Sequence, residues 1–187
     1  INVYNVMDQQ YNIELGKASA ESGQLAMKAM EQAVIDARNG DIDAIVTAPI
    51  NKSAMQMADF AHIGHTEFLT EKFGASETTM TLVSDNIRIA LASNHVAVEN
   101  IVQSLSKEKL IKKMKVLNKS MKQDFGIEKP VIAVLGLNPH AGDDGVIGQQ
   151  EQEFIKPAIK EAKNNGVLVS GPFPADGFFG SGDFRKF

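Results

Sequence analysis

The chain has 187 residues, of which 43% are hydrophobic and 22% are charged, and these proportions are those of a globular protein with a buried core. Its formal net charge is −4 at pH 7, so no bulk positive field exists to attract nucleic acid or an anionic membrane surface. The chain has no cysteine, which excludes disulfides, thiolate metal ligands and a cysteine nucleophile. Histidine and carboxylate side chains are therefore the expected ligands of any metal ion.

The sequence has no apolar run of membrane-spanning length, and its first residues do not form a charged and apolar leader. We therefore expect a cytoplasmic protein with no membrane partner and no nucleic-acid partner. The chain begins at Ile1 without a methionine and ends at Phe187 without a helix-capping signal. We expect it to be part of a longer protein.

The first half of the chain is predicted to contain a long helix, a buried strand and a short helix. Residues 22–39 place their apolar side chains on one helical face, and a glycine follows as a stop. Residues 44–46 form a short apolar run that is followed by a polar loop, which is typical of a buried parallel strand. Residues 66–73 are predicted to be helical with Thr66 as the N-cap. A loop after a parallel strand is where α/β proteins bind ligands.

The second half of the chain continues the alternation of helices and strands. Its elements are predicted from apolar periodicity and from the glycines that end the helices. In chain order we expect a β-hairpin over 79–83 and 87–92, a helix over 106–124, a buried strand over 131–135, a helix over 151–164, a strand over 167–169 and a turn-rich loop over 171–176. This order predicts an α/β fold with a mixed, largely parallel sheet flanked by helices, and it marks no internal domain boundary.

The four histidines are the first candidates for chemistry, although a single histidine is most often structural. His95 and His140 each follow a predicted strand, so both imidazoles are expected at one edge of the sheet. Two neutral imidazoles in a protein without cysteine suit Zn²⁺, Co²⁺, Ni²⁺ or Mn²⁺, provided that a further ligand is present. The candidates for that ligand are Asp143, Asp144, Asp176 and a residue outside this chain.

A second group of residues, around the predicted start of the helix at 66–73, could hold an anion. His65, the hydroxyl of Thr66 and the backbone N–H groups of a helix start together can bind phosphate or carboxylate. The alternative is that Thr66 only caps the helix and His65 is solvated. Lys52 follows the strand predicted at 44–46 and could reach a bound anion as a point charge.

The sequence does not identify residues that bind a nucleotide cofactor. It contains neither the Gly-x-Gly-x-x-Gly fingerprint of dinucleotide-binding folds nor the phosphate loop of nucleoside triphosphatases. The residue patterns by themselves therefore predict an α/β domain with a possible histidine metal site.

Five segments of the chain form recognisable motifs. In chain order they are VTAPINK at 46–52, GHTEF at 64–68, IALASNH at 89–95, GLNPHAG at 136–142 and GPFPAD at 171–176. Five motifs in one order are far more specific than any single histidine. Together they resemble the 4-hydroxythreonine-4-phosphate dehydrogenase family, and the resemblance extends from about residue 11 to the end of the chain.

The resemblance implies an enzyme of pyridoxine biosynthesis with a fold similar to that of the isocitrate and isopropylmalate dehydrogenases. It implies the oxidation and decarboxylation of 4-phosphohydroxy-L-threonine to 3-amino-2-oxopropyl phosphate, with NAD and a divalent ion of Zn, Co, Mg, Mn or Ni. It also implies that His95 and His140 are two of three histidine metal ligands and that His65 and Thr66 bind the substrate. The site would be shared between the subunits of a homodimer, with the third histidine and most nucleotide-binding loops beyond Phe187.

On this basis we interpret residues 1–187 as the central part of a two-domain dehydrogenase, a fragment that would be inactive alone. We assign Lys52 and Asp176 catalytic roles, as polar or acid–base groups near the substrate. Ala48 stands where many relatives have glycine and Asp143 where glutamate is common, which leaves open a related activity on 4-phosphothreonate or 4-phosphoerythronate.

Two alternatives come from other functional classes. A metal-dependent hydrolase would use His95, His140 and Asp176 and would turn over without NAD. A non-catalytic metal-binding domain would change in stability on chelation but would have no activity.

Overall fold

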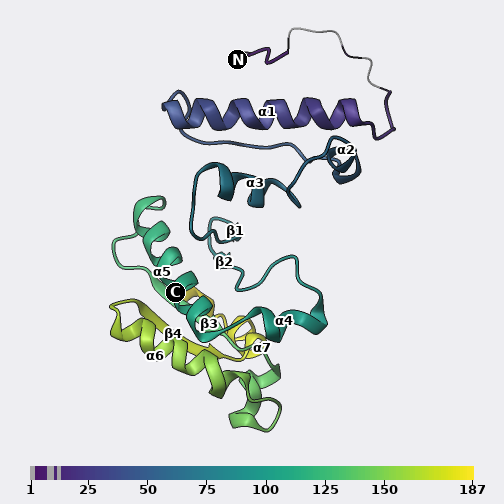
Figure 1. The fold of residues 1–187 in the computed structure, drawn as a ribbon. Helices are drawn as coiled ribbons and strands as arrows, with labels where there is room; N and C mark the ends of the chain where they lie inside the picture. Colours follow the sequence, from purple (N-terminus) through teal and green to yellow (C-terminus); the bar gives the residue numbers. More distant parts are fainter. Residues whose placement is uncertain (1–2, 8–10, 12–13) are drawn as a thin grey trace. The chain divides into compact units, whose positions relative to one another are not determined.

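The computed structural model describes residues 3–7, 11 and 14–187. The chain divides into two compact units, Ile1–Ser76 and Glu77–Phe187 (Figure 1). In the described part of the chain, no helix combines the length and the apolar character that crossing a bilayer requires.

The first unit is built from helices. They are α1 (Ala20–Asn39), α2 (Lys52–Met57) and α3 (His65–Lys72). The helix predicted over 22–39 is confirmed, and it begins two residues earlier because the Ser19 hydroxyl accepts a hydrogen bond from the backbone N–H of Ser22. Side chains from all three helices form the core of this unit, namely Met30, Val34, Met55 and Phe68.

Gly23 allows α1 and α2 to approach closely. A Cβ atom built on Gly23 would lie 2.1 Å from the carbonyl oxygen of Ala54 and 2.8 Å from the Cβ of Ala58. Real Cβ atoms do not come this near to backbone atoms, so a side chain at this position would push the two helices apart.

Two predictions for the first unit are wrong. Residues 44–46 form no strand, and Val46 is 97% exposed. An apolar run becomes a strand only where a second strand pairs with its backbone, and the described residues of this unit contain no strand. The third helix begins at His65 with Gly64 as its N-cap, so Thr66 is not the cap.

The second unit combines helices with two separate two-stranded sheets. Its strands are β1 (Thr81–Val83), β2 (Arg88–Ala90), β3 (Val131–Leu135) and β4 (Leu168–Phe173), and its α-helices are α4 (Ile101–Ser104), α5 (Lys107–Gln123), α6 (Lys156–Asn164) and α7 (Ala175–Gly180). β1 pairs with β2 antiparallel, and β3 pairs with β4 parallel. The mixed α/β class is confirmed, whereas only one of the two described pairs is parallel.

The core of the second unit lies between the β3–β4 pair and the helices α5 and α6. The amphipathic pattern of α5 positions it, because its apolar stripe is buried while most of its lysines are exposed. The fully buried Ala158 and Ala162 let α6 pack closely. The core side chains are Leu110, Ile111, Met114, Ile132, Ile155, Ala158, Ile159, Ala162, Val167 and Val169.

The hairpin, the helix over 106–124 and the strand over 131–135 are confirmed with small changes of bounds. The helix predicted over 151–164 is a π-helical turn, Glu151–Ile155, that continues into α6. The prediction of a loop over 171–176 is wrong. β4 continues to Phe173 because Gly136 N–H donates to the Phe173 carbonyl, and α7 begins directly afterwards.

Candidate functional site

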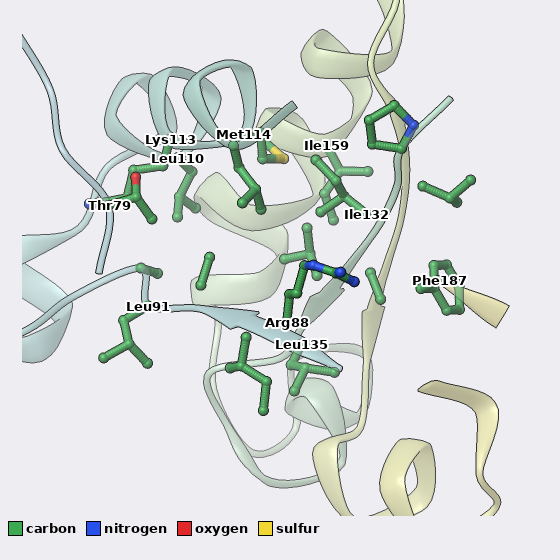
Figure 2. Close-up of a pocket in the computed structure, with 18 of the residues that line it drawn as sticks. Thr79, Arg88, Leu91, Leu110, Lys113, Met114, Ile132, Leu135, Ile159 and Phe187 are labelled. Carbon is green, nitrogen blue, oxygen red and sulfur yellow. The ribbon is translucent and has the colours of Figure 1, made fainter. Parts of the chain in front are cut away.

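A cavity of about 620 Å³ lies inside the second unit, and most of its wall is apolar. Figure 2 shows side chains of α5 and β3 on this wall, among them Leu110, Met114, Ile132 and Leu135. Polar side chains at the wall are few: Thr79, Asn86, Arg88, Ser93, Lys113 and Lys129. An apolar cavity with a few polar groups is the usual form of a small-molecule site.

The two loops that carry the predicted metal ligands both begin at this cavity. Its wall includes residues 91–93, directly before Asn94 and His95, and residues 135–137, which lead to His140. His95 stands five residues after the end of β2, and His140 stands five residues after the end of β3. The two loops therefore begin at one cavity wall, and the pairing of the two imidazoles stays a prediction.

Both histidines have an unusual backbone conformation. His95 has a φ of 56° and His140 a φ of 53°, which is the left-handed region that non-glycine residues rarely adopt. Such conformations cluster at ligand sites, where the surrounding structure holds them in place. Among the described residues, Asp59, Ala141, Asp143 and Asp144 share this conformation.

His140 lies beside a carboxylate. Its Nδ1 is 3.8 Å from Oδ2 of Asp176 at the start of α7, an ion-pair contact that is longer than a hydrogen bond. Both side chains are well exposed, so the contact contributes little to stability. A carboxylate at Nδ1 favours the tautomer in which Nε2 carries the lone pair, and that nitrogen can bind a metal ion.

A complete metal site is not formed by the described residues. Within residues 3–7, 11 and 14–187, no three His, Asp or Glu side chains gather in a geometry that could hold an ion. Of the predicted third ligands, Asp176 contacts His140, and Asp144 pairs instead with Lys156 at 3.3 Å. Asp143, the remaining predicted ligand within the chain, has a left-handed φ of 42°.

The predicted anion-binding residues belong to the first unit. His65 and Thr66 are the first two residues of α3, so their backbone N–H groups lie at the positive end of the helix dipole. Lys52 is the exposed first residue of α2, which Asn51 caps by accepting a hydrogen bond from the N–H of Ala54. His95, His140 and Asp176 belong to the other unit.

His62 is a structural residue. Its ring packs edge-on against Phe60 and Phe68, with centroids 5.2 Å and 5.6 Å away, and its Nε2 is 3.8 Å from Glu71. The side chain is only 14% exposed. His62 therefore belongs to the packing of the first unit.

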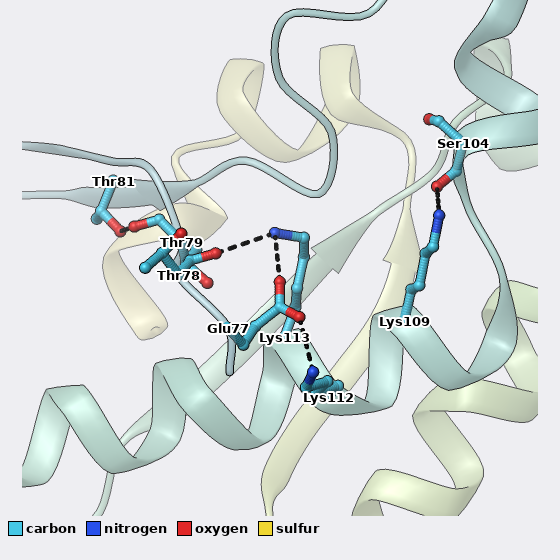
Figure 3. A network of polar contacts seen from close by, with 8 residues as sticks. All are labelled: Glu77, Thr78, Thr79, Thr81, Ser104, Lys109, Lys112 and Lys113. Carbon is cyan, nitrogen blue, oxygen red and sulfur yellow. Dashed lines mark hydrogen bonds and ion pairs between the residues drawn. The ribbon is translucent and has the colours of Figure 1, made fainter. Parts of the chain in front are cut away.

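Four lysines of α5 contact other parts of the fold, and Figure 3 shows three of them, namely Lys109, Lys112 and Lys113. Glu77 pairs with Lys112 at 3.3 Å and with Lys113 at 3.4 Å, and Lys113 also donates to the carbonyl of Thr78. Glu77 therefore ties the segment before β1 to α5 through two lysines.

One residue near the candidate site was missed by the sequence predictions. Glu151 is fully buried, and its carboxylate accepts hydrogen bonds from the backbone N–H groups of Leu137 and Asn138 and from the side-chain amide of Asn138. Burial by itself raises the pKa of Glu151, but these hydrogen bonds outweigh it and hold the pKa below its ordinary value. A signal was present, because helical spacing places Glu151 on the apolar face of Ile155 and Ala158.

The fold and the loops define a mixed α/β protein with two histidine-bearing loops at strand ends. Residues 1–187, the whole chain, match the family model described as "Pyridoxal phosphate biosynthetic protein PdxA". The chain belongs to this family, as the five motifs predicted.

Two curated relatives of the chain share one name. The 4-hydroxythreonine-4-phosphate dehydrogenase of Bacteroides thetaiotaomicron is 43% identical over 188 residues, which cover 100% of this chain and 52% of that protein. The protein of the same name from Sulfurihydrogenibium sp. is 37% identical over 179 residues, which cover 96% of this chain and 54% of that protein. The chain spans about half the length of the curated relatives it matches.

Solved structures show the same likeness. The structure of 4-hydroxythreonine-4-phosphate dehydrogenase from Klebsiella pneumoniae matches with a TM-score of 0.86 and 30% identity, over 93% of this chain and 52% of that chain. A terephthalate 1,2-cis-dihydrodiol dehydrogenase from Burkholderia xenovorans matches with a TM-score of 0.67 at 24% identity, over 91% of this chain and 54% of that chain. The second match concerns the fold alone.

Proposed function

We propose that the protein catalyses the NAD-linked, divalent-metal-dependent oxidation and decarboxylation of 4-phosphohydroxy-L-threonine to 3-amino-2-oxopropyl phosphate, a step of pyridoxal phosphate biosynthesis. Membership of the family over all 187 residues supports this reaction. The observation that carries the site is the shared cavity wall from which the loops of His95 and His140 begin. A cytoplasmic location and an isocitrate-dehydrogenase-like fold are part of the same proposal.

His95 and His140 would hold the divalent ion. Imidazoles without thiolates fit Zn²⁺, Co²⁺, Ni²⁺ or Mn²⁺ well and Mg²⁺ less well, and the left-handed backbone of both residues is the kind that ligand sites adopt. When bound, such an ion would act as a Lewis acid toward the substrate hydroxyl, and NAD would accept the hydride. The residues that bind NAD are not assigned. The third ligand is assigned to a residue outside this chain.

The remaining predicted residues have roles toward the substrate and the ligands. His65 and Thr66 bind the phosphate group at the positive end of α3. Asp176 orients His140 through the contact to Nδ1 and is placed to exchange a proton near the substrate. Lys52 contributes a positive charge. The active site is shared between the two subunits of a homodimer, as the resemblance to the family implies.

The test uses the full-length protein and three variants. We expect His140→Ala to weaken metal binding by more than about 100-fold, since even outer-shell partners of metal ligands contribute about 10- to 100-fold. His95→Ala is expected to behave in the same way. His65→Ala is the matched comparison, because it should retain the metal and raise the KM for 4-phosphohydroxy-L-threonine. Metal content and NADH formation are measured for each protein.

The experiment also separates the alternatives, and bound metal without any turnover would favour the non-catalytic metal-binding domain. Equal metal content and rate in the wild-type protein and His140→Ala would remove the metal-site assignment. Turnover without NAD would favour the hydrolase, and faster turnover of 4-phosphothreonate or 4-phosphoerythronate would favour the related dehydrogenase.

A further inference from the structure

We propose that Glu151 is a positioning residue: its buried carboxylate holds the loop that presents His140, and thereby sets the affinity of the protein for its divalent ion. The loop in question, residues 136–148, is called the His140 loop here. The proposal rests on the proposed function, because it takes His140 to be a metal ligand.

The contacts of Glu151 go to the start of the His140 loop. Its Oε1 accepts from the backbone N–H groups of Leu137 and Asn138, both at 2.8 Å, and its Oε2 accepts from Nδ2 of Asn138 at 2.8 Å. Hydrogen bonds to an ionised acceptor are roughly twice as strong as those between neutral groups, and complete burial strengthens them further. In the described part of the chain, Glu151 is the only buried residue with a charged or polar side chain.

The His140 loop needs such an anchor because its backbone is strained. The five consecutive residues from His140 to Asp144 have φ angles between 42° and 81°, so the chain makes a left-handed turn. L-residues disfavour this conformation, and apart from glycine it occurs as single residues rather than as runs. A run of this kind persists only where the surrounding structure determines it.

The glycines of the His140 loop fit around the same carboxylate. A Cβ atom on Gly142 would lie 2.6 Å from Oε2 of Glu151, and one on Gly148 would lie 2.5 Å from Nδ2 of Asn138. The carboxylate therefore touches the middle of the turn as well as its start. Asn138 joins the two ends, because its Nδ2 also donates to Oε1 of Gln150 at 2.8 Å.

Both carboxylate oxygens of Glu151 must act as acceptors. In Glu151→Gln the new amide oxygen can accept from the two backbone N–H groups, but the new NH₂ group faces the NH₂ group of Asn138. Adding Asn138→Asp reverses donor and acceptor, so the new amide donates to the new carboxylate. The amide of Gln150 can turn so that it also donates to that carboxylate.

The experiment titrates the metal-free full-length protein with Zn²⁺ and follows hydrogen exchange of residues 136–148. Glu151→Gln is expected to weaken Zn²⁺ binding by about 10- to 100-fold and to speed exchange in the His140 loop. The double variant Glu151→Gln with Asn138→Asp is expected to recover most of both. Glu153→Gln, an exposed position on the same helical turn, is the matched control and should change neither.

The outcomes separate this proposal from the proposed function. If His140→Ala weakens Zn²⁺ binding and Glu151→Gln does not, Glu151 only stabilises the fold and the proposal is overturned. If His140→Ala itself leaves binding unchanged, the metal site is wrong, and the positioning role falls with it. If Glu151→Gln fails to fold, the Zn²⁺ affinity of the double variant tests the proposal instead. Wild-type Zn²⁺ affinity then supports the proposal, and a folded double variant that binds weakly contradicts it.

Discussion

Glu151 and Gly142 are two residues of the second unit whose roles depend on each other. The carboxylate of Glu151 is ionised although it is buried, because three hydrogen bonds stabilise the charge. Gly142 supplies the room for that carboxylate at a left-handed position. The chemistry of the candidate site therefore depends on residues that are not themselves predicted ligands.

The lowered pKa of Glu151 predicts a pH dependence of stability. A carboxyl group with a depressed folded pKa contributes its full stabilisation above the unfolded value, close to the ordinary 4.5, and loses it as the pH falls through the folded value. We expect the difference in free energy of unfolding between the wild-type protein and Glu151→Gln to be constant near neutral pH and to shrink below about 4.5. Urea unfolding at a series of pH values measures it. A difference that grows on acidification would contradict the assignment.

A second residue-scale prediction concerns Gly142→Ala. The alanine would have to adopt a left-handed backbone with a φ of 81°, and its Cβ would lie 2.6 Å from Oε2 of Glu151. We expect a loss of about 2–4 kcal/mol in the free energy of unfolding, as the sum of strain and steric conflict. Gly166→Ala separates the two causes, because Gly166 has a φ of 80° with no atom within 4 Å of the added Cβ. It should lose only about 1 kcal/mol. Equal losses would show that the carboxylate contact does not matter.

At the scale of the elements, the contact between α1 and α2 is governed by a single glycine. An alanine in the interior of a helix normally stabilises it by about 1 kcal/mol relative to glycine. Gly23 is buried, and its Cα faces the backbone of Ala54, so packing outweighs propensity at this position.

Gly23→Ala is therefore expected to destabilise the protein, by about 1–3 kcal/mol. Gly177→Ala in α7 is the comparison, because an added Cβ there meets nothing within 4 Å. That change should be neutral or stabilising. Thermal unfolding of both variants shows whether each change raises or lowers the stability of the protein. A more stable Gly23→Ala protein would refute the close approach of the two helices.

At the scale of the whole molecule, each compact unit has its own core. Met30, Val34, Met55 and Phe68 form one core, and Ile159 belongs to the other, between α5, α6 and the β3–β4 pair. Local stability follows the density of buried apolar contacts, so hydrogen exchange should report the two cores separately.

We expect Met30→Ala to speed amide exchange in α1 and Ile159→Ala to speed it in α6 and β4. Each change should lower the free energy of unfolding by about 2–5 kcal/mol. Ile35→Ala is a control on α1, because Ile35 is 50% exposed and its replacement should change the free energy of unfolding little. Mass spectrometry of exchanged peptides resolves the regions. No change in α6 after Ile159→Ala would be inconsistent with the core described here.

The sequence was sufficient wherever a segment's own pattern decides its structure. The helices at 22–39 and 106–124 were found because their apolar side chains recur at helical spacing and a glycine follows shortly after each of them. The strand at 131–135 was found because it is a continuous apolar run. The motifs around His95 and His140 were recognisable because their order along the chain is specific, as the family match confirms.

Tertiary structure decided what depends on partners far away in the sequence. Residues 44–46 have a strand-like composition but no pairing strand in the described part of their unit, whereas β4 extends through 171–173 because β3 lies beside it. The burial of Glu151 and the left-handed turn at His140 exist only together, since each requires the hydrogen bonds and the space that the other supplies. Local pattern determines helices and strands; the geometry of the candidate ligands is a property of the packed molecule.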